Sequence, residues 1–497
     1  MSRRLQRYLS HLASFAGRQA VGMVVNVLMT GYLYARLGKE GYGIWAIALS
    51  LGSYMGLVDL NTNASVVKYT AELEAKGRRD ELVPMVNAGV QILFGFSFGL
   101  LALGLIGLPW LTPLIFKTTI YSPKQMMLLS GLCLFSFALL QTGNVYQQVL
   151  QGLLRQHEVN AIGAAGIIIN AAAACSVVAL GLDVVWLGAA NLLGTLTVLL
   201  ATRLRVARLV PELPWFDLRS TAQWRQALLH FSAGSYAFTL WGWFYFTGPK
   251  MLLANLLGPV SVGFYDVGTR VAAIGRNLVQ NFSQYLIPFM SETGAKEGAK
   301  KLQALQVQAV TYLWMLGLGV GGYFLAVREP LVQRWLHSDE PQLLTAMFWV
   351  LLEYMFGGLV MPWVHFALAE GRLKHAWPFL AYIIPGCVLG PWVGLHYGGF
   401  TGFLVGGALA NSAGTAFFYV LALRERHMPM WPLMGRIAKV CLGWGTGWLA
   451  LAAVPWPASI LGLALAGLLW ALVLGSVWAL LGLIDKALLQ RLPGRAA

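Results

Sequence analysis

The chain has 497 residues, of which 58% are hydrophobic and 11% are charged, and its mean hydropathy is +0.64. Soluble domains carry about 25% charged residues, so this composition excludes a soluble enzyme and predicts a polytopic membrane protein. The net charge of +15 comes from short stretches between apolar runs and not from one solvated face. It therefore does not predict nucleic-acid binding.

Apolar runs of about 20 residues, the length that crosses a bilayer, follow one another along the whole chain. We expect about fourteen transmembrane helices, which makes the chain an all-α membrane protein. In chain order the predicted spans are 12–33, 41–61, 84–108, 125–148, 159–181, 184–203, 227–249, 259–286, 305–326, 342–366, 376–396, 399–423, 435–456 and 458–484.

The basic residues are distributed unevenly between the two sets of loops. Roughly 26 of the 35 Lys and Arg residues fall on the side of the N-terminus, and about seven, including Lys39, Lys124 and Lys250, fall on the other side. Cytoplasmic loops carry the excess of positive charge, so both termini are predicted to be cytoplasmic.

A segment near the N-terminus recurs 220 positions later without a gap. Each copy has a glycine-punctuated turn, a bulky apolar pair, a long apolar helix and a polar end. The matched residues are Leu37, Gly38, Gly43, Asn61, Glu72, Ala75 and Lys76 with Leu257, Gly258, Gly263, Asn281, Glu292, Ala295 and Lys296. An even number of spans separates the copies, so both enter the membrane with the same polarity. We therefore predict two six-helix lobes related by a parallel pseudo-two-fold repeat.

The repeat suggests a division of the chain into four parts. We expect an N-lobe at 1–203, a cytoplasmic interfacial linker at 204–226, a C-lobe at 227–423, and two extra spans with a cytoplasmic tail at 424–497. The extra spans lie outside the repeat and are expected to face lipid.

Ionisable groups inside a bilayer cost about 2.5–3.5 kcal/mol each, so those within spans predict a cavity or a partner. The span 259–286 carries a polar stripe at helical spacing. Its members are Asp266, Arg270, Asn277, Asn281 and Gln284, with Arg276 and Gln280 beside them. At 1.5 Å per residue, Arg270 lies about 16 Å and Arg276 about 25 Å from the outer face, while Arg18 lies about 9 Å from the inner face. Guanidiniums at this depth suit a diphosphate, because they pair bidentately with phosphate oxygens. For Arg18, snorkelling to the inner headgroups is the alternative.

The span 125–148 carries a stripe of amides, Gln141, Asn144 and Gln148, which continues to Gln151. Amides hold sugar hydroxyls through paired donors and acceptors, but they also join helices to one another. Both interpretations stay open from the sequence.

Three acidic residues are candidates for binding a coupling ion or proton: Glu353, Asp59 and Asp266. Glu353 lies in the middle of a span, where burial favours the protonated carboxyl, and a hydrogen-bonded core carboxyl is the alternative. Asp266 precedes Arg270 by four residues, which also allows an ion pair within the helix. Asp59 lies at a span end and is equally interpreted as solvated.

The sequence contains no catalytic motif. The four cysteines lie singly inside apolar runs, and the eight histidines are scattered. We therefore predict neither a cofactor nor a metal site, and a protein that is not an enzyme.

The segment Ala35–Trp45, followed by 57–60 and 67–72, resembles the N-terminal signature of Wzx-type polysaccharide flippases in the multidrug/oligosaccharidyl-lipid/polysaccharide superfamily. Asn61 departs from it, because many relatives have Gly there. The resemblance implies a V-shaped two-lobe transporter of the bacterial inner membrane. It would move undecaprenyl-diphosphate-linked oligosaccharide to the outer leaflet by alternating access, for O-antigen, exopolysaccharide or capsule synthesis. Arg18, Arg270 and Arg276 would hold the diphosphate.

The resemblance also implies partners. These are the lipid-linked glycan, membrane lipid, a coupling cation (H⁺ or Na⁺), and a polysaccharide polymerase with its chain-length regulator. Three other classes stay open: a multidrug/cation antiporter of the same superfamily, a lipid II flippase, and a membrane polymerase or ligase. The last of these needs a large outward loop, and the longest predicted ones, near 109–124 and 327–341, are short.

Overall fold

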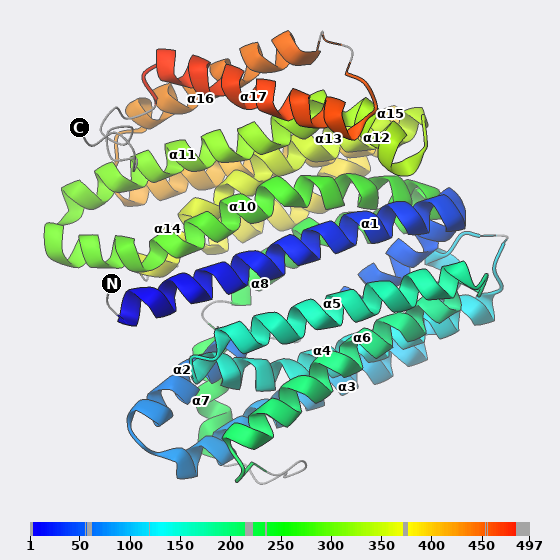
Figure 1. Cartoon of the computed structure of the whole chain (residues 1–497), viewed down its shortest axis with the longest axis vertical. Coiled ribbons are helices and arrows are strands. Elements are labelled where there is room, and N and C mark those ends of the chain that lie inside the picture. The colour runs from blue at the N-terminus through cyan, green and yellow to red at the C-terminus, as the bar shows by residue number, and fades with distance from the viewer. Residues whose placement is uncertain are drawn as a thin grey trace. The chain divides into compact units, whose positions relative to one another are not determined.

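The computed structural model describes residues 3–54, 56, 62–118, 120–213, 222–233, 236–370, 376–452, 454 and 456–483. These residues are helical apart from short turns, and no strand occurs among them (Figure 1). In this described part, nine helical segments are long and apolar enough to cross a membrane. Two of them, Gly17–Ser53 and Trp377–Glu425, each overlap two of the predicted spans. The predicted all-helical membrane fold is confirmed.

The α-helices are α1 (Arg3–Ser53), α2 (Thr62–Ala75), α3 (Leu82–Ile115), α4 (Pro123–Gly152), α5 (Gln156–Ala179), α6 (Val185–Leu209), α7 (Ala222–Ala233), α8 (Tyr236–Phe246), α9 (Gly248–Leu257), α10 (Pro259–Glu297), α11 (Ala299–Ala326), α12 (Arg328–Leu336), α13 (Pro341–Gly357), α14 (Met361–Glu370), α15 (Ala376–Glu425), α16 (Met430–Ala452) and α17 (Ile460–Leu480). Short 3₁₀ turns precede α3 (Arg79–Glu81) and α14 (Gly358–Val360).

The two copies of the repeated segment begin with the same backbone turn. α1 is interrupted at Gly38, where φ is 70° and ψ is 178°. Gly258, its predicted equivalent, joins α9 to α10 with φ 82° and ψ −176°. Side chains other than hydrogen rarely tolerate this region, so glycine is required at both turns. The sequence repeat therefore corresponds to a repeated backbone conformation.

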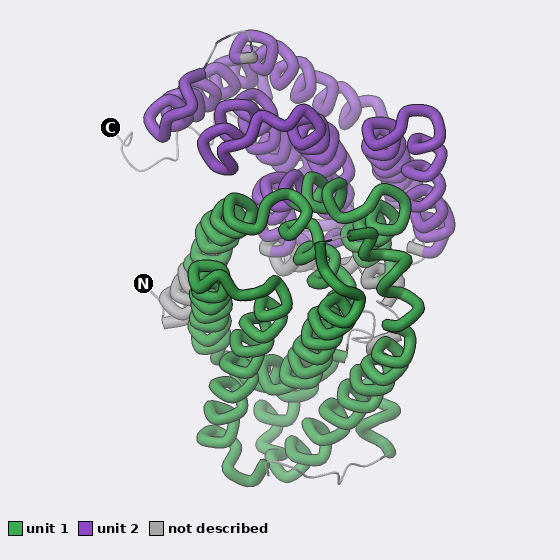
Figure 2. Tube along the Cα trace, turned by 90° about the vertical axis from the view of Figure 1, so that its right-hand side faces the viewer, with its two compact units in different colours: residues 1–266 green, residues 267–497 purple. Residues whose placement is uncertain are grey.

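The chain divides into two compact units, residues 1–266 and 267–497, coloured separately in Figure 2. Unit 1 includes α7, α8 and α9, because α7 packs against α2 and α3 and α9 packs against α1 and α3. Part of the predicted linker, residues 214–221, lies outside the described residues. The four-part division predicted from the sequence stays a prediction.

Small residues allow the helices of unit 1 to pack closely. Gly166 of α5 faces Val198 of α6, and Gly152 at the end of α4 faces Thr70 of α2, in each case too closely for a Cβ atom. Such contacts are common where lipid supplies no hydrophobic driving force between helices. Valines and leucines around the fully buried Val145 form the core near one end of the bundle.

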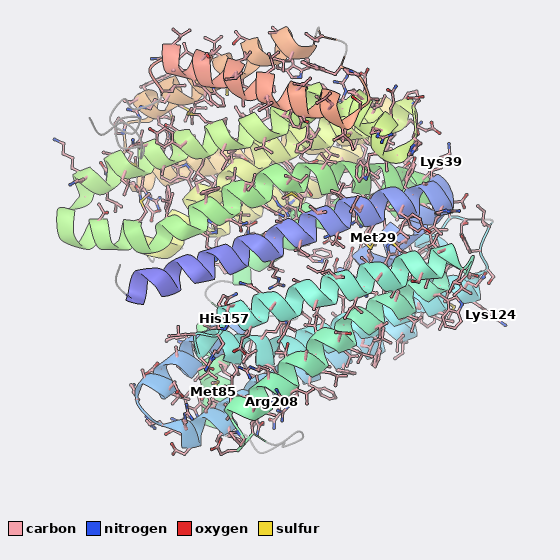
Figure 3. The ribbon with its side chains drawn as sticks, in the orientation of Figure 1. Met29, Lys39, Met85, Lys124, His157 and Arg208 are labelled. Atoms are coloured by element: carbon pink, nitrogen blue, oxygen red, sulfur yellow. The ribbon has the colours of Figure 1, made fainter. Side chains whose placement is uncertain are left out.

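Charged residues gather at the two ends of unit 1 (Figure 3). Lys39 and Lys124 lie at one end, and His157 and Arg208 lie at the other. This is the separation that the positive-inside pattern predicted, although the side facing the cytoplasm stays a prediction. At the α2 end, Arg79 Nε and Nη2 donate to Glu74 at 2.9 and 2.6 Å. This bidentate pair lowers the pKa of the Glu74 carboxyl.

Each unit has a buried arginine near the end of a long helix. Arg203 of α6 packs over the Tyr146 ring at 5.2 Å and donates to the Leu213 carbonyl at 2.9 Å. Arg426, just after α15, packs over Trp363 at 5.3 Å and donates to the Ala422 carbonyl at 3.1 Å. Both were counted from the sequence as loop charge, whereas the structure uses them to fix helix ends.

In unit 2, α15 is a helical hairpin that turns at Gly398 and Gly399. Its two arms touch through backbone, because a Cβ on Gly394 or Gly402 would overlap the carbonyl of the other. The predicted extra spans correspond to α16 and α17, which pack on α11. There Trp470 Nε1 donates to the Gly319 carbonyl at 2.6 Å.

Two shorter helices, α2 and α12, were not predicted as elements, and α7 begins in the predicted linker and overlaps the start of the predicted span 227–249. α12 occupies the predicted outward loop at 327–341 and buries Val332 and Leu336, which lie four residues apart. Its polar residues mask this periodicity in a hydropathy scan, because only one narrow face is apolar.

Candidate functional site

Arg18 lies in the first segment of α1 and is half-buried against α5. A Cβ built on Gly163 of α5 would lie 2.7 Å from both Cζ and Nε of Arg18. The guanidinium therefore rests on the helix backbone at a position that only glycine leaves open. This contact lies within unit 1, and the assignment of Arg18 to a substrate site stays a prediction.

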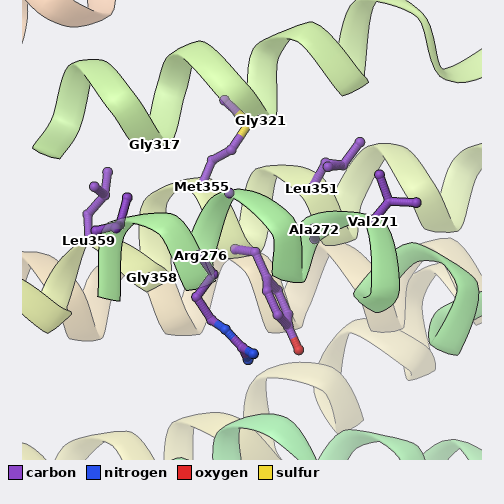
Figure 4. Close-up of a pocket in the computed structure, with 12 residues that line it drawn as sticks. Val271, Ala272, Arg276, Gly317, Gly321, Leu351, Met355, Gly358 and Leu359 are labelled. Atoms are coloured by element: carbon purple, nitrogen blue, oxygen red, sulfur yellow. The ribbon is translucent and has the colours of Figure 1, made fainter. Parts of the chain in front are cut away.

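Arg276 lies on α10 in unit 2 beside a small crevice, shown in Figure 4. Its Nη2 donates to the adjacent Asn277 Oδ1 at 2.8 Å, and its Cζ lies 5.5 Å from the Tyr354 ring centroid. Figure 4 shows the side chain extending away from α11, which carries Gly317 and Gly321. The amide and the ring hold the guanidinium in one orientation, which reduces the entropy lost on binding an anion.

The crevice itself is mainly apolar. Apart from Arg276 and Tyr354 it is lined by Val271, Ala272, Gly275, Val279, Gly317, Gly321, Leu351, Met355, Gly358 and Leu359. Any polar recognition there therefore comes from Arg276 and Tyr354.

The remaining members of the α10 stripe differ in exposure. Arg270 and Asn281 are half-buried, and Gln284 is exposed. Asp266 is 4% exposed. It accepts hydrogen bonds from Tyr42 Oη and Lys250 Nζ, each at 2.5 Å. All of these residues lie on α10, and the acidic one is held by side chains from two other elements.

The amides of α4 form a hydrogen-bonded ladder along the helix. Gln147 Nε2 donates to Asn144 Oδ1 at 3.0 Å, and Asn144 Nδ2 donates to Gln141 Oε1 at 3.0 Å. Gln141 is 8% exposed, while Asn144 and Gln148 are half-buried. These contacts lie within one helix, so the ladder presents an ordered row of amides in unit 1.

Glu353 of α13 is 2% exposed in unit 2. Its Oε1 accepts from Asn411 Nδ2 at 2.6 Å, and Asn411 Oδ1 accepts from the Cys387 thiol at 3.2 Å. Asn411 and Cys387 come from the two arms of α15, so one arm bonds the carboxyl directly and the other arm bonds the amide that holds it. A buried carboxyl with amide and thiol neighbours is well suited to carry a proton.

Asp59 and Asn61 lie outside the described residues. No group of three or more His, Cys, Asp or Glu side chains within the described ranges has the arrangement of a metal site.

Several residues of these clusters were not singled out from the sequence. They are Tyr42, Lys250, Gly163, Tyr354, Cys387 and Asn411. Asn411 was open to detection, because a lone amide inside an apolar run needs a partner. The others are ordinary residues for their helices, and only their spatial neighbours identify them.

Comparison with known proteins places these features in a family. The model of the family described as polysaccharide biosynthesis protein matches residues 8–294, which is more than half of the chain. No curated protein matches the sequence closely enough to report.

Solved structures share the fold at low sequence identity. The lipid II flippase MurJ, in an inward closed conformation, has a TM-score of 0.72 and 11% identity over 95% of this chain and 99% of that one. A multidrug resistance MATE family transporter, inward-facing, has a TM-score of 0.67 and 14% identity over 82% and 97%. A transporter from Pyrococcus furiosus has a TM-score of 0.52 and 12% identity over 85% and 94%. The fold is the one that these solved transporter structures have, and the chain belongs to the polysaccharide biosynthesis protein family.

Proposed function

We propose that the protein is a flippase for undecaprenyl-diphosphate-linked oligosaccharide units. It moves them from the inner to the outer leaflet of the bacterial inner membrane by alternating access, for the synthesis of O-antigen, exopolysaccharide or capsule. The match to the polysaccharide biosynthesis family over residues 8–294 carries this proposal. That range includes α1 and most of α10, the helices on which the deep arginines lie.

The arginines supply the chemistry for the diphosphate. Arg18, Arg270 and Arg276 each present a planar guanidinium fork that matches phosphate oxygens. Arg276 is oriented by Asn277 and Tyr354, and Arg18 by the backbone at Gly163. We assign the diphosphate to these three side chains, and the lipid tail stays in the bilayer.

The amide ladder of α4 is proposed to contact the glycan. Gln141, Asn144 and Gln148 together offer donors and acceptors to sugar hydroxyls without adding charge. Gln141 and Asn144 are joined to each other, and Asn144 to Gln147, along one helix, so this part of the row stays ordered when a glycan is absent.

Transport is proposed to be coupled to an ion, with Glu353 as the group that binds it. The carboxyl is buried and accepts a hydrogen bond from Asn411, whose own oxygen accepts from Cys387 on the other arm of α15. A proton fits this setting better than Na⁺, because Na⁺ prefers oxygen ligands and the neighbouring Asn411 nitrogen points at the carboxylate. A polysaccharide polymerase and its chain-length regulator are the expected users of the product.

The test uses purified protein in vesicles that contain a polyprenyl-diphosphate-linked oligosaccharide. Translocation is measured as loss of glycan from reach of an added, membrane-impermeant glycosidase. We expect Arg270→Ala to slow translocation at least about thirtyfold, because removing one partner of a buried charge pair costs 2–5 kcal/mol. Arg334→Ala on α12, whose side chain is exposed, serves as the matched control and should transport normally.

The substrate panel separates the candidate functions. The same lipid with a monophosphate should move poorly, because the arginines are assigned to the two phosphates of a diphosphate. The likeness to MurJ makes a polyprenyl-diphosphate muropeptide the second candidate substrate. Preferential movement of the muropeptide would replace the proposed glycan, and normal transport by Arg270→Ala would remove Arg270 from the site.

A further inference from the structure

Three polar side chains from three helical segments meet in unit 1. Tyr42 lies in the second segment of α1, Lys250 in α9 and Asp266 in the second turn of α10. Tyr42 Oη donates to Asp266 Oδ2 at 2.5 Å, and Lys250 Nζ donates to Asp266 Oδ1 at 2.5 Å. Both oxygens of one carboxylate are therefore occupied by groups from two other segments.

This polar trio is almost completely enclosed. Tyr42 is 1% and Asp266 is 4% exposed, and the Lys250 side chain is 15% exposed. A buried carboxylate is stable only while it is paired, and removing a single partner leaves a charge without solvent. The contact is therefore either fully made or fully broken and rehydrated.

The trio lies next to the closest backbone approach in unit 1. A Cβ built on Gly43 would overlap the carbonyl of Pro259, and a Cβ built on Gly263 would lie 3.2 Å from the Gly43 Cα. Gly43 and Gly263 are equivalent in the repeat, so the two copies meet there. Contact between backbones has no flexible side chains to absorb small shifts, so it too is made or broken as a unit.

The polar contact breaks the symmetry of this crossing. At the spacing of 220 residues, Tyr42 corresponds to Val262, and Asp266 corresponds to Ala46. The repeated glycines are explained by close packing, but the trio occurs only once and is not needed for that packing. Its residues therefore call for a separate explanation.

We infer that Tyr42, Lys250 and Asp266 form a latch that holds the second segment of α1 against α9 and the start of α10. The latch lies near Lys39 and the Gly38 turn, at the end of unit 1 that is predicted to face outward. It opens in each cycle so that the substrate headgroup leaves on that side. This inference rests on the proposed function, since alternating access requires helices at one membrane face to separate.

A cysteine reporter tests the latch in intact cells. Ser261, in the first turn of α10, is 8% exposed, and Ser261→Cys is nearly isosteric. Its reaction with a membrane-impermeant maleimide is measured against the parent chain, whose four native cysteines give the baseline. In this background, Asp266→Asn keeps the shape of the side chain but removes its charge. We expect the labelling rate to rise about tenfold, because losing one hydrogen bond to a charged group shifts the equilibrium toward the open latch by about that factor.

Two more variants guard against misfolding. Tyr42→Phe and Lys250→Gln each remove one contact and should also raise labelling. Combining Lys250→Gln with Asp266→Asn should add little, because both act on one contact. Glu40→Gln is the matched control: this carboxylate near the Gly38 turn accepts a hydrogen bond from Thr118 and should leave labelling at baseline.

The outcomes of the two proposals are separate. Unchanged labelling in Asp266→Asn, Tyr42→Phe and Lys250→Gln overturns the latch, even if glycan transport is confirmed. Raised labelling in those variants supports the latch, even if the wild-type protein moves no lipid-linked glycan in vesicles, a result that removes only the proposed substrate.

Discussion

The two copies of the repeated segment build the same backbone. Each begins at a glycine with positive φ, 70° at Gly38 and 82° at Gly258. Each then buries a bulky pair completely, Ile44 and Trp45 in the first copy and Phe264 and Tyr265 in the second, all at most 1% exposed. What the copies share therefore forms the turn and the packing.

The copies differ in the polar side chains that they carry into the bundle. The second segment of α1 has no charged residue between Gly41 and Ser53, whereas α10 carries Asp266, Arg270 and Arg276 over a comparable stretch. We infer that the repeated residues determine the fold, and that residues present in only one copy supply the proposed chemistry. Substitutions in the two classes should therefore have different consequences.

Gly43→Ala should have the largest effect, because it tests a shared residue. The added methyl group meets backbone at Pro259, which has no room to rotate away. Overpacking costs about 1–3 kcal/mol, so we expect less protein in membranes and a lower melting temperature in detergent. Gly95→Ala on α3 is the matched control, because no atom lies within 4 Å of the added carbon.

The melting temperature of Gly43→Ala can contradict this prediction. A melting temperature for Gly43→Ala equal to that of Gly95→Ala would mean that the crossing adjusts freely. The two copies would then not need close backbone contact, and the packing would not require glycine at Gly43 and Gly263.

Glu353→Gln should have a smaller and more selective effect, because it tests a residue confined to one half. Gln Oε1 still accepts from Asn411, so the melting temperature should change little. A glutamine side chain does not gain or lose a proton in this pH range. Transport should therefore lose its dependence on an imposed pH gradient, while slow translocation without a gradient persists. The measurement compares glycan translocation in vesicles with and without the pH gradient. Asn411→Asp is a second variant, in which a side-chain oxygen that can accept from Cys387 is kept.

The result of Glu353→Gln decides between coupling and structure. If the variant responds to the gradient as the wild type does, Glu353 is a core carboxyl and the coupling group lies elsewhere. If transport by the wild-type protein depends on a Na⁺ gradient, the coupling ion is Na⁺ and not a proton.

The sequence was sufficient for the fold because the signals for it are local. Apolar runs of span length predict helices, and the turn at Gly38 was recognisable because it recurs at Gly258. α12 was missed because nine residues with one narrow apolar face resemble a polar loop.

The candidate site was predicted only in part, because its contacts join distant residues. The sequence indicated Arg18, Asp266 and Glu353 as polar groups in apolar runs. It contained no information that Tyr42 lies 224 residues from its acceptor Asp266, or that Asn411 lies 58 residues from Glu353. A polar residue within a span is a local observation, whereas its partner depends on how the helices pack.

Gly163→Ala should have the smallest effect. It tests a residue of the first half of the chain that positions Arg18. The new methyl group would meet the far end of the Arg18 side chain, which is flexible, so the fold should tolerate it. The guanidinium has to move, and we expect glycan translocation to slow about tenfold, because a displaced binding group loses its alignment with the substrate. Gly22→Ala at the same α1–α5 contact is the matched control, since its added carbon meets Ile167 at an ordinary 3.5 Å. A lower melting temperature with normal transport would make Arg18 a packing residue, and the diphosphate would then be left to the arginines of α10.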